Sequence, residues 1–220
     1  MRTIVIAPHP DDEVLGVGGT LSRRKADGGS VAWLSVTGIS EAAGWRPERV
    51  AEREQEIGEI ARLFDFDEVY RLEFPPAGLD QVPVGELVGK ISAAFQSFRP
   101  QEIFVPHYGD VHSDHRLIFN AVASCTKWFR YPSVKRVLAY ETLSETGFGL
   151  LPVGAFNPNY FVDISGHLDR KLQAMQIYRS ELGDHPFPRS VEAIRALATF
   201  RGAMSGYKIA EAFELLRERE

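Results

Sequence analysis

The chain has 220 residues, of which 44% are hydrophobic and 25% charged, as is usual for a water-soluble globular protein. Its length fits one α/β domain, residues 1–220, better than two domains. The formal net charge is −5 without a long run of either sign, so the charge pattern argues against nucleic-acid binding.

The sequence has features of an intracellular protein. Its single cysteine, Cys125, excludes an internal disulfide framework, and the apolar residues around it predict a buried structural thiol. The apolar run at the N-terminus ends at Pro8 and is too short for a signal peptide. No run of about 18 apolar residues predicts a membrane-spanning helix. We therefore expect a cytoplasmic protein without an integral membrane segment.

Short apolar, β-branched runs alternate with longer helical patterns in the first 140 residues. The predicted strands are 3–7, 31–37, 68–72, 102–105 and 136–140. The predicted helices are 14–27, 47–64, 84–98 and 114–128. This alternation predicts an α/β fold with a Rossmann-like, mostly parallel sheet and helices on both faces.

The pattern changes after about residue 141. Residues 141–158 are rich in Gly, Ser, Thr and Pro and predict a long loop. A strand at 160–164 and helices at 168–179 and 190–204 are expected to follow. We interpret this C-terminal strand and these helices as an appendage to the same domain.

The first predicted strand ends directly in a polar cluster. His9, Asp11, Asp12 and Glu13 place one imidazole and three carboxylates within five positions, where open α/β sheets bind ligands. Histidine nitrogen and aspartate oxygen suit a divalent metal. An aspartate before a helix is also a common N-cap. The cluster alone leaves both interpretations open.

A second polar cluster, residues 106–115, follows the fourth predicted strand and precedes a predicted helix. It contains His107, Asp110, His112, Asp114 and His115. The carboxyl ends of parallel strands lie at one edge of a sheet, so we expect the two clusters to converge. Together they predict a shared metal site.

The two segments His9-Pro10-Asp11-Asp12-Glu13 and His112-Ser113-Asp114-His115 closely resemble the signature motifs of the PIG-L/LmbE-like family of zinc-dependent N-acetylglucosamine deacetylases. The resemblance covers both motifs, their order and the Rossmann-like layout up to about residue 140. It implies that His9, Asp12 and His115 bind Zn²⁺. Similar ligand sets accept other divalent transition metals.

The resemblance also implies catalytic roles. Asp11 would be the general base, His112 would stabilise the oxyanion, and Asp114 would be a partner of a histidine. Glu13 would support the first turn of the helix. Some family members have a tyrosine just before the second motif, where this chain has Asp110-Val111, and Tyr108 is the nearest substitute.

These roles agree with the chemistry of amide hydrolysis. Three protein ligands leave a coordination position for water or a carbonyl oxygen. An adjacent carboxylate that does not bind the metal can accept the proton of water. An imidazolium that faces the acetyl oxygen would stabilise the tetrahedral intermediate, and a carboxylate beside it would favour its charged form.

The sequence indicates substrate-binding residues less clearly than metal-binding residues. Arg49 and Arg53 suit hydroxyl or phosphate oxygens, although a solvated helix face rich in glutamates explains them equally well. The loop after residue 140 offers polar side chains for a sugar-binding rim. The candidates in that loop are Glu141, Ser144 and Glu145, and further candidates near the site are Tyr108, His107, His185 and Arg189.

The leading hypothesis is an N-deacetylase that acts on a small acetylamino sugar or its conjugate, for example in surface-polysaccharide or glycoconjugate biosynthesis. The alternatives are a metal-dependent amidohydrolase for a non-sugar acyl amide and a non-catalytic sugar- or nucleotide-binding module. The glycines at 16, 18 and 19 lack the dinucleotide-binding spacing and predict close helix–sheet packing. Whether the chain forms a homo-oligomer stays open.

Overall fold

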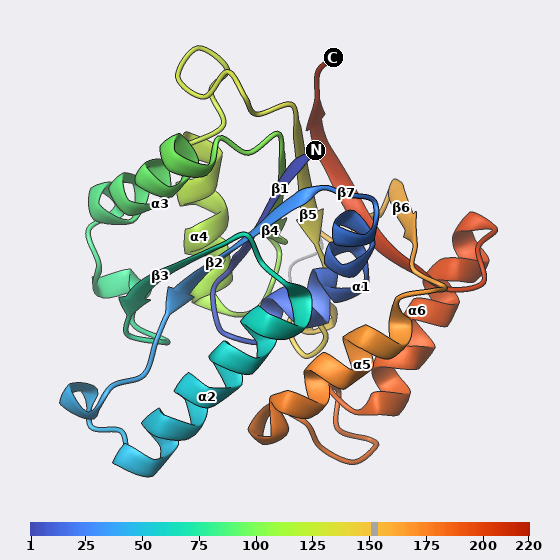
Figure 1. Ribbon diagram of the computed structural model, residues 1–220, viewed down its shortest axis with the longest axis horizontal. Coiled ribbons are helices and arrows are strands. Elements are labelled where there is room, and N and C mark those ends of the chain that lie inside the picture. Colours follow the sequence, from blue (N-terminus) through green and yellow to red (C-terminus); the bar gives the residue numbers. More distant parts are fainter. Residues whose placement is uncertain (151–153) are drawn as a thin grey trace.

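The computed structural model describes residues 1–150 and 154–220, so part of the predicted loop 141–158 lies outside the described residues (Figure 1). The described strands form one sheet of seven, in the order β3-β2-β1-β4-β5-β7-β6. Strands β1 to β5 are parallel, and β7 is antiparallel to both of its neighbours. This order, with its reversal between β1 and β4, is that of Rossmann-like sheets. The predicted fold class is confirmed.

The strands are β1 (Arg2–Ala7), β2 (Ser30–Thr37), β3 (Glu68–Phe74), β4 (Glu102–Pro106), β5 (Arg136–Tyr140), β6 (Tyr160–Asp163) and β7 (Ala210–Glu218). The helices are α1 (Asp12–Ala26), α2 (Pro47–Phe64), α3 (Val84–Phe98), α4 (Ser113–Ser124), α5 (Leu168–Ile177) and α6 (Val191–Ser205). Along residues 1–150 and 154–220, no helix is both long and apolar enough to cross a membrane.

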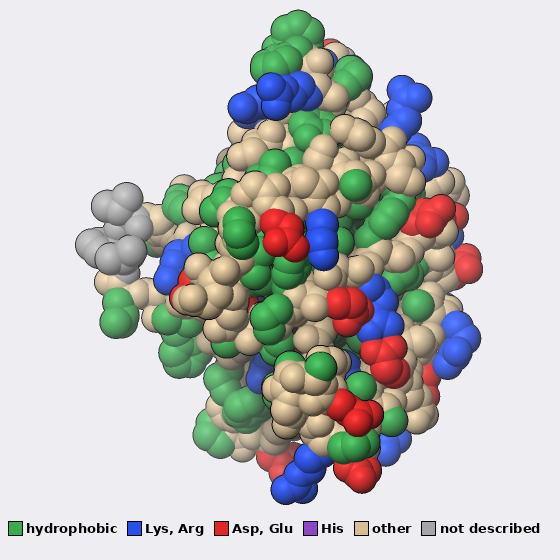
Figure 2. Space-filling model, turned by 90° about the vertical axis from the view of Figure 1, so that its left-hand side faces the viewer, with side chains coloured by type: hydrophobic (Ala, Val, Ile, Leu, Met, Phe, Trp, Pro, Cys, Tyr) green, Lys and Arg blue, Asp and Glu red, His purple; other side chains and the backbone are tan. Residues whose placement is uncertain are grey.

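Two elements differ from the sequence prediction. Strand β7 was not expected, and it separates β6 from β5, so the appended strand joins the sheet only through β7. Helix α4 ends at Ser124, four residues before its predicted end, and residues 125–135 form a loop of turns. Figure 1 shows this loop extending beyond the amino ends of the parallel strands, and Figure 2 shows hydrophobic side chains at this end of the molecule.

The sheet is buried on both faces. Successive residues of a strand point to opposite sides, so Val5 joins one core while Ile4 and Ile6 join the other. Helices α1, α2, α5 and α6 cover the first core, and α3 and α4 cover the second (Figure 1). Cys125 is buried in the second core, as predicted.

Helix α1 approaches the sheet closely because its glycines have no side chain. A Cβ atom on Gly16 would lie 2.2 Å from the ring of Tyr140. Tyr140 is fully buried and donates a hydrogen bond from its hydroxyl to the carbonyl of Ile6 at 2.9 Å. The predicted helix–sheet packing role of Gly16 is therefore confirmed, and this contact fixes the start of α1 against β1 and β5.

Candidate metal centre

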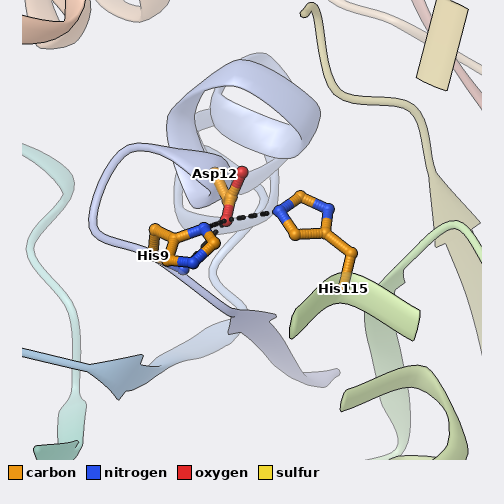
Figure 3. A group of neighbouring side chains, drawn as sticks. All are labelled: His9, Asp12 and His115. Atoms are coloured by element: carbon orange, nitrogen blue, oxygen red, sulfur yellow. Dashed lines mark hydrogen bonds and ion pairs between the residues drawn. The ribbon is translucent and has the colours of Figure 1, made fainter. Parts of the chain in front are cut away.

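The two polar clusters meet at the point where the strand order reverses. His9 follows β1, Asp12 begins α1, and His115 lies in the first turn of α4 after β4. Figure 3 shows the three side chains pointing toward one another. Asp12 Oδ2 lies 3.4 Å from His9 Nδ1 and 3.3 Å from His115 Nε2. Each residue thus offers one ligand atom to a common point.

Each of these histidines is oriented by a carboxylate on its far side. His115 Nδ1 lies 2.7 Å from Asp110 Oδ2, and His9 Nε2 lies 3.0 Å from Asp114 Oδ2. An ionised carboxylate can only accept a hydrogen bond, so the ring proton of each histidine belongs on the nitrogen that faces the carboxylate. When the ring is neutral, the other nitrogen, His115 Nε2 or His9 Nδ1, carries a lone pair that faces Asp12.

This arrangement fits a metal ion. His115 is fully buried, and its Nε2 has no hydrogen-bond partner among the described residues. A buried polar atom without a partner is costly in a folded protein. Two imidazoles and one carboxylate form a donor set that zinc accepts, with a coordination position left for a small oxygen ligand. A bound cation would satisfy the unpaired nitrogen.

The carboxylates also control the protonation of the cluster. Burial alone would lower the pKa of His9, but hydrogen bonds to Asp114 and Asp12 outweigh it and raise the pKa to about 9. Burial likewise opposes the charged form of His115, yet the charge of Asp12 and the bond to Asp110 raise its pKa to about 10. In the metal-free protein, both ring nitrogens of His9 and of His115 are therefore protonated at neutral pH, and both rings are positively charged.

Asp11 lies beside the cluster in a strained conformation. Its φ of 138° falls in a region that residues with a side chain rarely adopt. Glu13 holds this conformation because its Oε2 accepts the Asp11 N–H at 3.1 Å, while its Oε1 accepts the Tyr178 hydroxyl at 2.8 Å. The sequence-based prediction that Glu13 supports this turn agrees with these contacts.

The carboxylate of Asp11 pairs with Arg189, whose Nη1 lies 3.1 Å from Asp11 Oδ2. Burial, together with the charges of Asp12 and Glu181, raises the pKa of Asp11 well above its usual range, and Arg189 opposes this effect. A buried carboxylate with a raised pKa in the wall of a cavity is a candidate for proton transfer during catalysis.

His112 completes the cluster. Its ring centroid lies 4.5 Å from that of His9, and its Nδ1 accepts the Asp114 N–H at 3.1 Å. Burial and the positive charges of His9 and His115 lower the pKa of His112. Because Nδ1 accepts a hydrogen bond, the ring proton of a neutral His112 lies on Nε2. The carboxylate of Asp114 bonds to His9 and not to His112, so Asp114 is the partner of His9.

A cavity of about 310 Å³ opens above the cluster. The predicted site residues His9, Asp11, Asp12, His112 and His115 lie in its wall. Asp114 is fully buried behind His9, where it also accepts the backbone N–H of Ala77 at 2.8 Å. The structure thus brings the predicted metal-binding and catalytic residues together at one cavity.

Of the two predicted arginines on α2, Arg53 reaches the cavity, and Arg189 also lies in its wall. Arg53 Nη1 donates to the carbonyl of Pro10 at 2.9 Å, and the Arg53 guanidinium also pairs with Glu181 and Glu56. Arg49 pairs with Glu52 at 2.8 Å and with Ser180, and it is not part of the cavity wall. The position of Arg49 does not match the expected substrate contact.

The loop after β5 contributes some of its predicted residues. Ser144 and Glu145 lie in the cavity wall. Glu141 instead forms a bidentate ion pair with Arg201 outside the cavity. Arg201 Nε donates to Oε1 at 2.8 Å, and Nη2 donates to Oε2 at 2.7 Å. Tyr108 packs its ring 4.4 Å from that of His107 and also lies outside. Neither Glu141 nor Tyr108 therefore takes the expected place beside a substrate.

Several residues at this site had no assigned role from the sequence. Asp110 orients His115, and its Oδ1 accepts the Thr146 hydroxyl at 2.6 Å. Glu181 pairs with Arg53 and lies 3.5 Å from Arg189, so it links α2 to the loop before α6. Trp45 adds an aromatic side chain to the cavity wall. Of these, only Asp110 carries a sequence signal, through its place in the second cluster.

The chain is thus an α/β protein with a Rossmann-like sheet and a His-Asp-His cluster at its switch point that could hold a metal ion. The model of the PIG-L family, described as GlcNAc-PI de-N-acetylase, matches residues 4–126. The chain belongs to this family. The family resemblance predicted from the two motifs is confirmed.

Its relatives include deacetylases. A diacetylchitobiose deacetylase from Thermococcus kodakarensis is 26% identical over 98% of this chain and 83% of its own length. The structure of an N,N'-diacetylchitobiose deacetylase from Pyrococcus horikoshii is 25% identical, with a TM-score of 0.77 over 98% of this chain and 84% of that one. A conserved protein from Thermus thermophilus is 32% identical, with a TM-score of 0.78 over 99% and 96% of the two chains.

Proposed function

We propose that the chain is a zinc-dependent N-deacetylase that hydrolyses the acetamide of a small amino sugar or its conjugate. The observation that carries this proposal is the convergence of His9, Asp12 and the unpartnered Nε2 of His115 beside Asp11 on one cavity. The deacetylase relatives support the choice of reaction. The cation would be held by these three side chains, and when bound it would make water more acidic and polarise the acetyl carbonyl.

Asp11 is the general base in this mechanism. It accepts a proton from water as the carbon–oxygen bond forms, and it then delivers that proton to the nitrogen of the departing amine. Glu13 keeps the backbone of Asp11 in its unusual conformation, and Arg189 holds the carboxylate in place. Burial raises the pKa of Asp11, which makes its carboxylate a stronger acceptor for the proton of water.

His112 stabilises the oxygen that becomes negative in the tetrahedral intermediate. Its Nδ1 is occupied by the backbone N–H of Asp114, so its Nε2 proton is free to donate to that oxygen. A neutral donor fixed in this way needs no reorganisation during the reaction. Losing such a donor typically costs about 10²- to 10³-fold in rate.

The wall of the cavity supports a sugar as the substrate. Arg53, Glu181, Ser144 and Glu145 supply hydrogen-bonding groups, and Trp45 supplies an aromatic face. Sugars are bound by this combination of polar groups and a flat apolar surface. The cavity volume of about 310 Å³ falls within the ordinary range for small-molecule sites, roughly 300–1,000 Å³.

An acetate-release assay tests this proposal. Acetylated monosaccharides, disaccharides and nucleotide conjugates should be compared with non-sugar acetamides of similar size, with and without a chelator. We expect chelator-sensitive acetate release from at least one acetylamino sugar. Preference for a non-sugar amide would favour the alternative amidohydrolase. Saturable sugar binding without acetate release would favour a binding module.

A further inference from the structure

A second surface with a distinct chemical character lies at the opposite end of the sheet from the cavity. The cavity lies at the carboxyl ends of the parallel strands, whereas the loop of residues 125–135 lies at their amino ends. Strand β1 has six residues, so about 20 Å of strand separates these ends. We refer to residues 125–135, with the cations around them described below, as the distal pole.

Two large aromatic side chains project from the distal pole. Arg130 N–H donates to the carbonyl of Lys127 at 2.9 Å, which closes a turn with Trp128 and Phe129 at its centre. Trp128 is 66% exposed and Phe129 is 62% exposed. Their rings meet edge to face at 5.9 Å. Exposed adjacent aromatics at the tip of a turn are unfavourable in water unless another surface covers them.

Packing and hydrogen bonds of the flanking residues anchor the base of this turn. Tyr131 is buried against Phe95, and its hydroxyl donates to Ser92 at 2.8 Å. Arg217 donates to the carbonyl of Thr126 at 2.9 Å, and Arg219 donates to that of Val134 at 3.0 Å. The tip therefore presents its aromatic pair on an anchored base.

The same pole carries a concentration of positive charge. Lys127 and Arg130 flank the aromatic pair in the sequence. A hollow that includes Ser133 and Lys135 of the same loop is also lined by Arg2 and Arg99. The lining of this hollow includes no acidic residue. Among the described residues, the side chains of Arg2, Arg99, Lys127 and Arg130 form no ion pair with an aspartate or glutamate, whereas Lys135 Nζ lies 3.5 Å from the terminal oxygen of Glu220. Glu218 and Glu220 lie at the same end of the sheet, where Glu218 pairs with Arg136, but the seven cations of the pole, Arg217 and Arg219 included, outnumber them. The chain as a whole has a net charge of −5, so this pole is basic in an acidic protein.

We propose that the distal pole is a membrane-docking surface for an anionic lipid bilayer. Aromatic rings favour the level of the lipid headgroups, and nearby lysines and arginines gain energy from anionic headgroups. Figure 2 shows this combination, with hydrophobic side chains at the top of the molecule and Lys and Arg side chains directly below them. The strength of interfacial binding scales with buried apolar area plus attraction to anionic lipids, and this pole supplies both contributions.

The charge argues for a lipid surface over a second copy of the chain. A symmetric contact between two distal poles would bring their unpaired cations face to face. A single nucleic-acid strand needs a groove with accessible aromatic faces, whereas Trp128 and Phe129 pack edge to face on a projecting tip. Docking by this pole leaves the cavity at the far end of the sheet open to the solution.

Vesicle sedimentation tests the proposal directly. Vesicles of phosphatidylcholine should be compared with vesicles that also contain phosphatidylserine, at about 150 mM and about 1 M salt. We expect binding to the anionic vesicles, with at least about tenfold weaker binding to neutral ones and loss at high salt. Equal binding to both kinds of vesicle, or none to either, would overturn the proposal.

Matched variants separate the two signals. Trp128→Ser with Phe129→Ser should abolish stable attachment, whereas Phe200→Ser, which removes a side chain 59% exposed on α6, should not. Arg99→Glu with Lys135→Glu should weaken binding at least about 20-fold, since each cation contributes about fivefold. Arg62→Glu with Arg195→Glu, on α2 and α6, should have little effect.

Two further outcomes would contradict a lipid partner. Concentration-dependent self-association that Trp128→Ser abolishes, without vesicle binding, would assign the pole to a contact between copies. Binding to a single-stranded oligonucleotide without vesicle binding would assign it to nucleic acid. Quenching of Trp128 fluorescence by a spin-labelled lipid, absent in Trp128→Phe, would confirm insertion of the tip.

Discussion

His115 donates its Nδ1 proton to Asp110 across 2.7 Å, and this bond leaves Nε2 facing Asp12 at 3.3 Å. Both side chains are fully buried, so water does not compete for the contact. Asp114 holds His9 in the same way. The proposed metal site therefore depends on two carboxylates that do not belong to the proposed ligand set.

Replacing Asp110 should weaken metal binding without removing a ligand. In Asp110→Ala, His115 loses the partner that fixes its ring and its tautomer, and we expect a roughly 10- to 100-fold higher Kd for Zn²⁺. Competition with a chromogenic chelator measures this value. Asp80→Ala, which changes an exposed acidic residue near α3, is the matched control. An unchanged Kd in Asp110→Ala would remove Asp110 from this role.

Replacing a proposed ligand should have a larger effect. His115→Ala removes one of three donor atoms, and we expect the protein to retain well below one Zn²⁺ per chain after dialysis. Elemental analysis gives this stoichiometry. His167→Ala is a suitable control because His167 bonds to Ser22 away from the cavity. Retention of a full equivalent of zinc by the folded His115→Ala protein would show that the ion binds elsewhere.

Replacing the proposed base should separate binding from catalysis. Asp11→Asn keeps the shape of the side chain but cannot accept the proton of water. We expect zinc content to stay near one per chain and kcat to fall roughly 10²- to 10⁴-fold, the range for a lost general base. Steady-state acetate release gives kcat. A variant that turns over at the wild-type rate would exclude Asp11 as the base.

Metal binding should release protons at neutral pH. The pKa values of His9 and His115 are raised to about 9 and about 10 in the metal-free protein, so both rings are charged at pH 7. Each must lose a proton to offer a lone pair, and we expect about two protons released per ion bound. As pH rises toward these pKa values, proton competition weakens and the apparent affinity increases. Calorimetry in buffers of different ionisation enthalpy counts the protons, and a count near zero would contradict the proposed ligand set.

The residues at the centre of the proposed site could be predicted because they lie in two short motifs of adjacent residues. His9, Asp12 and His115 lie in two short motifs that directly follow strands, and parallel strands bring their ends together. The partners of these residues were harder to predict. Asp110 lies in the same segment, but its pairing with His115 depends on the path of the loop. Arg189 was only one of several candidates, since its approach to Asp11 requires the loop before α6 to fold back over the cavity.

The missed strand has a similar explanation. Residues 210–218 have the sequence AEAFELLRE, and Ala, Glu and Leu all favour helices. They form β7 because hydrogen bonds to β5 and β6 on either side outweigh local preference. Strand pairing of this kind is a tertiary effect, so local patterns in the sequence did not reveal it. A polar loop after β5 was predicted. The sequence did not show that Ser144 and Glu145 lie in the cavity wall while Glu141 lies outside it.

Reconstitution of the metal-free protein with Zn²⁺ is the most direct test of the metal-dependent mechanism. Metal-free protein should be titrated with Zn²⁺ while bound metal and acetate release from an acetylamino sugar are measured together. We predict that activity is absent without metal and rises in proportion to bound zinc up to one ion per chain. Full activity in protein that retains less than about a tenth of an equivalent of any transition metal would contradict the account.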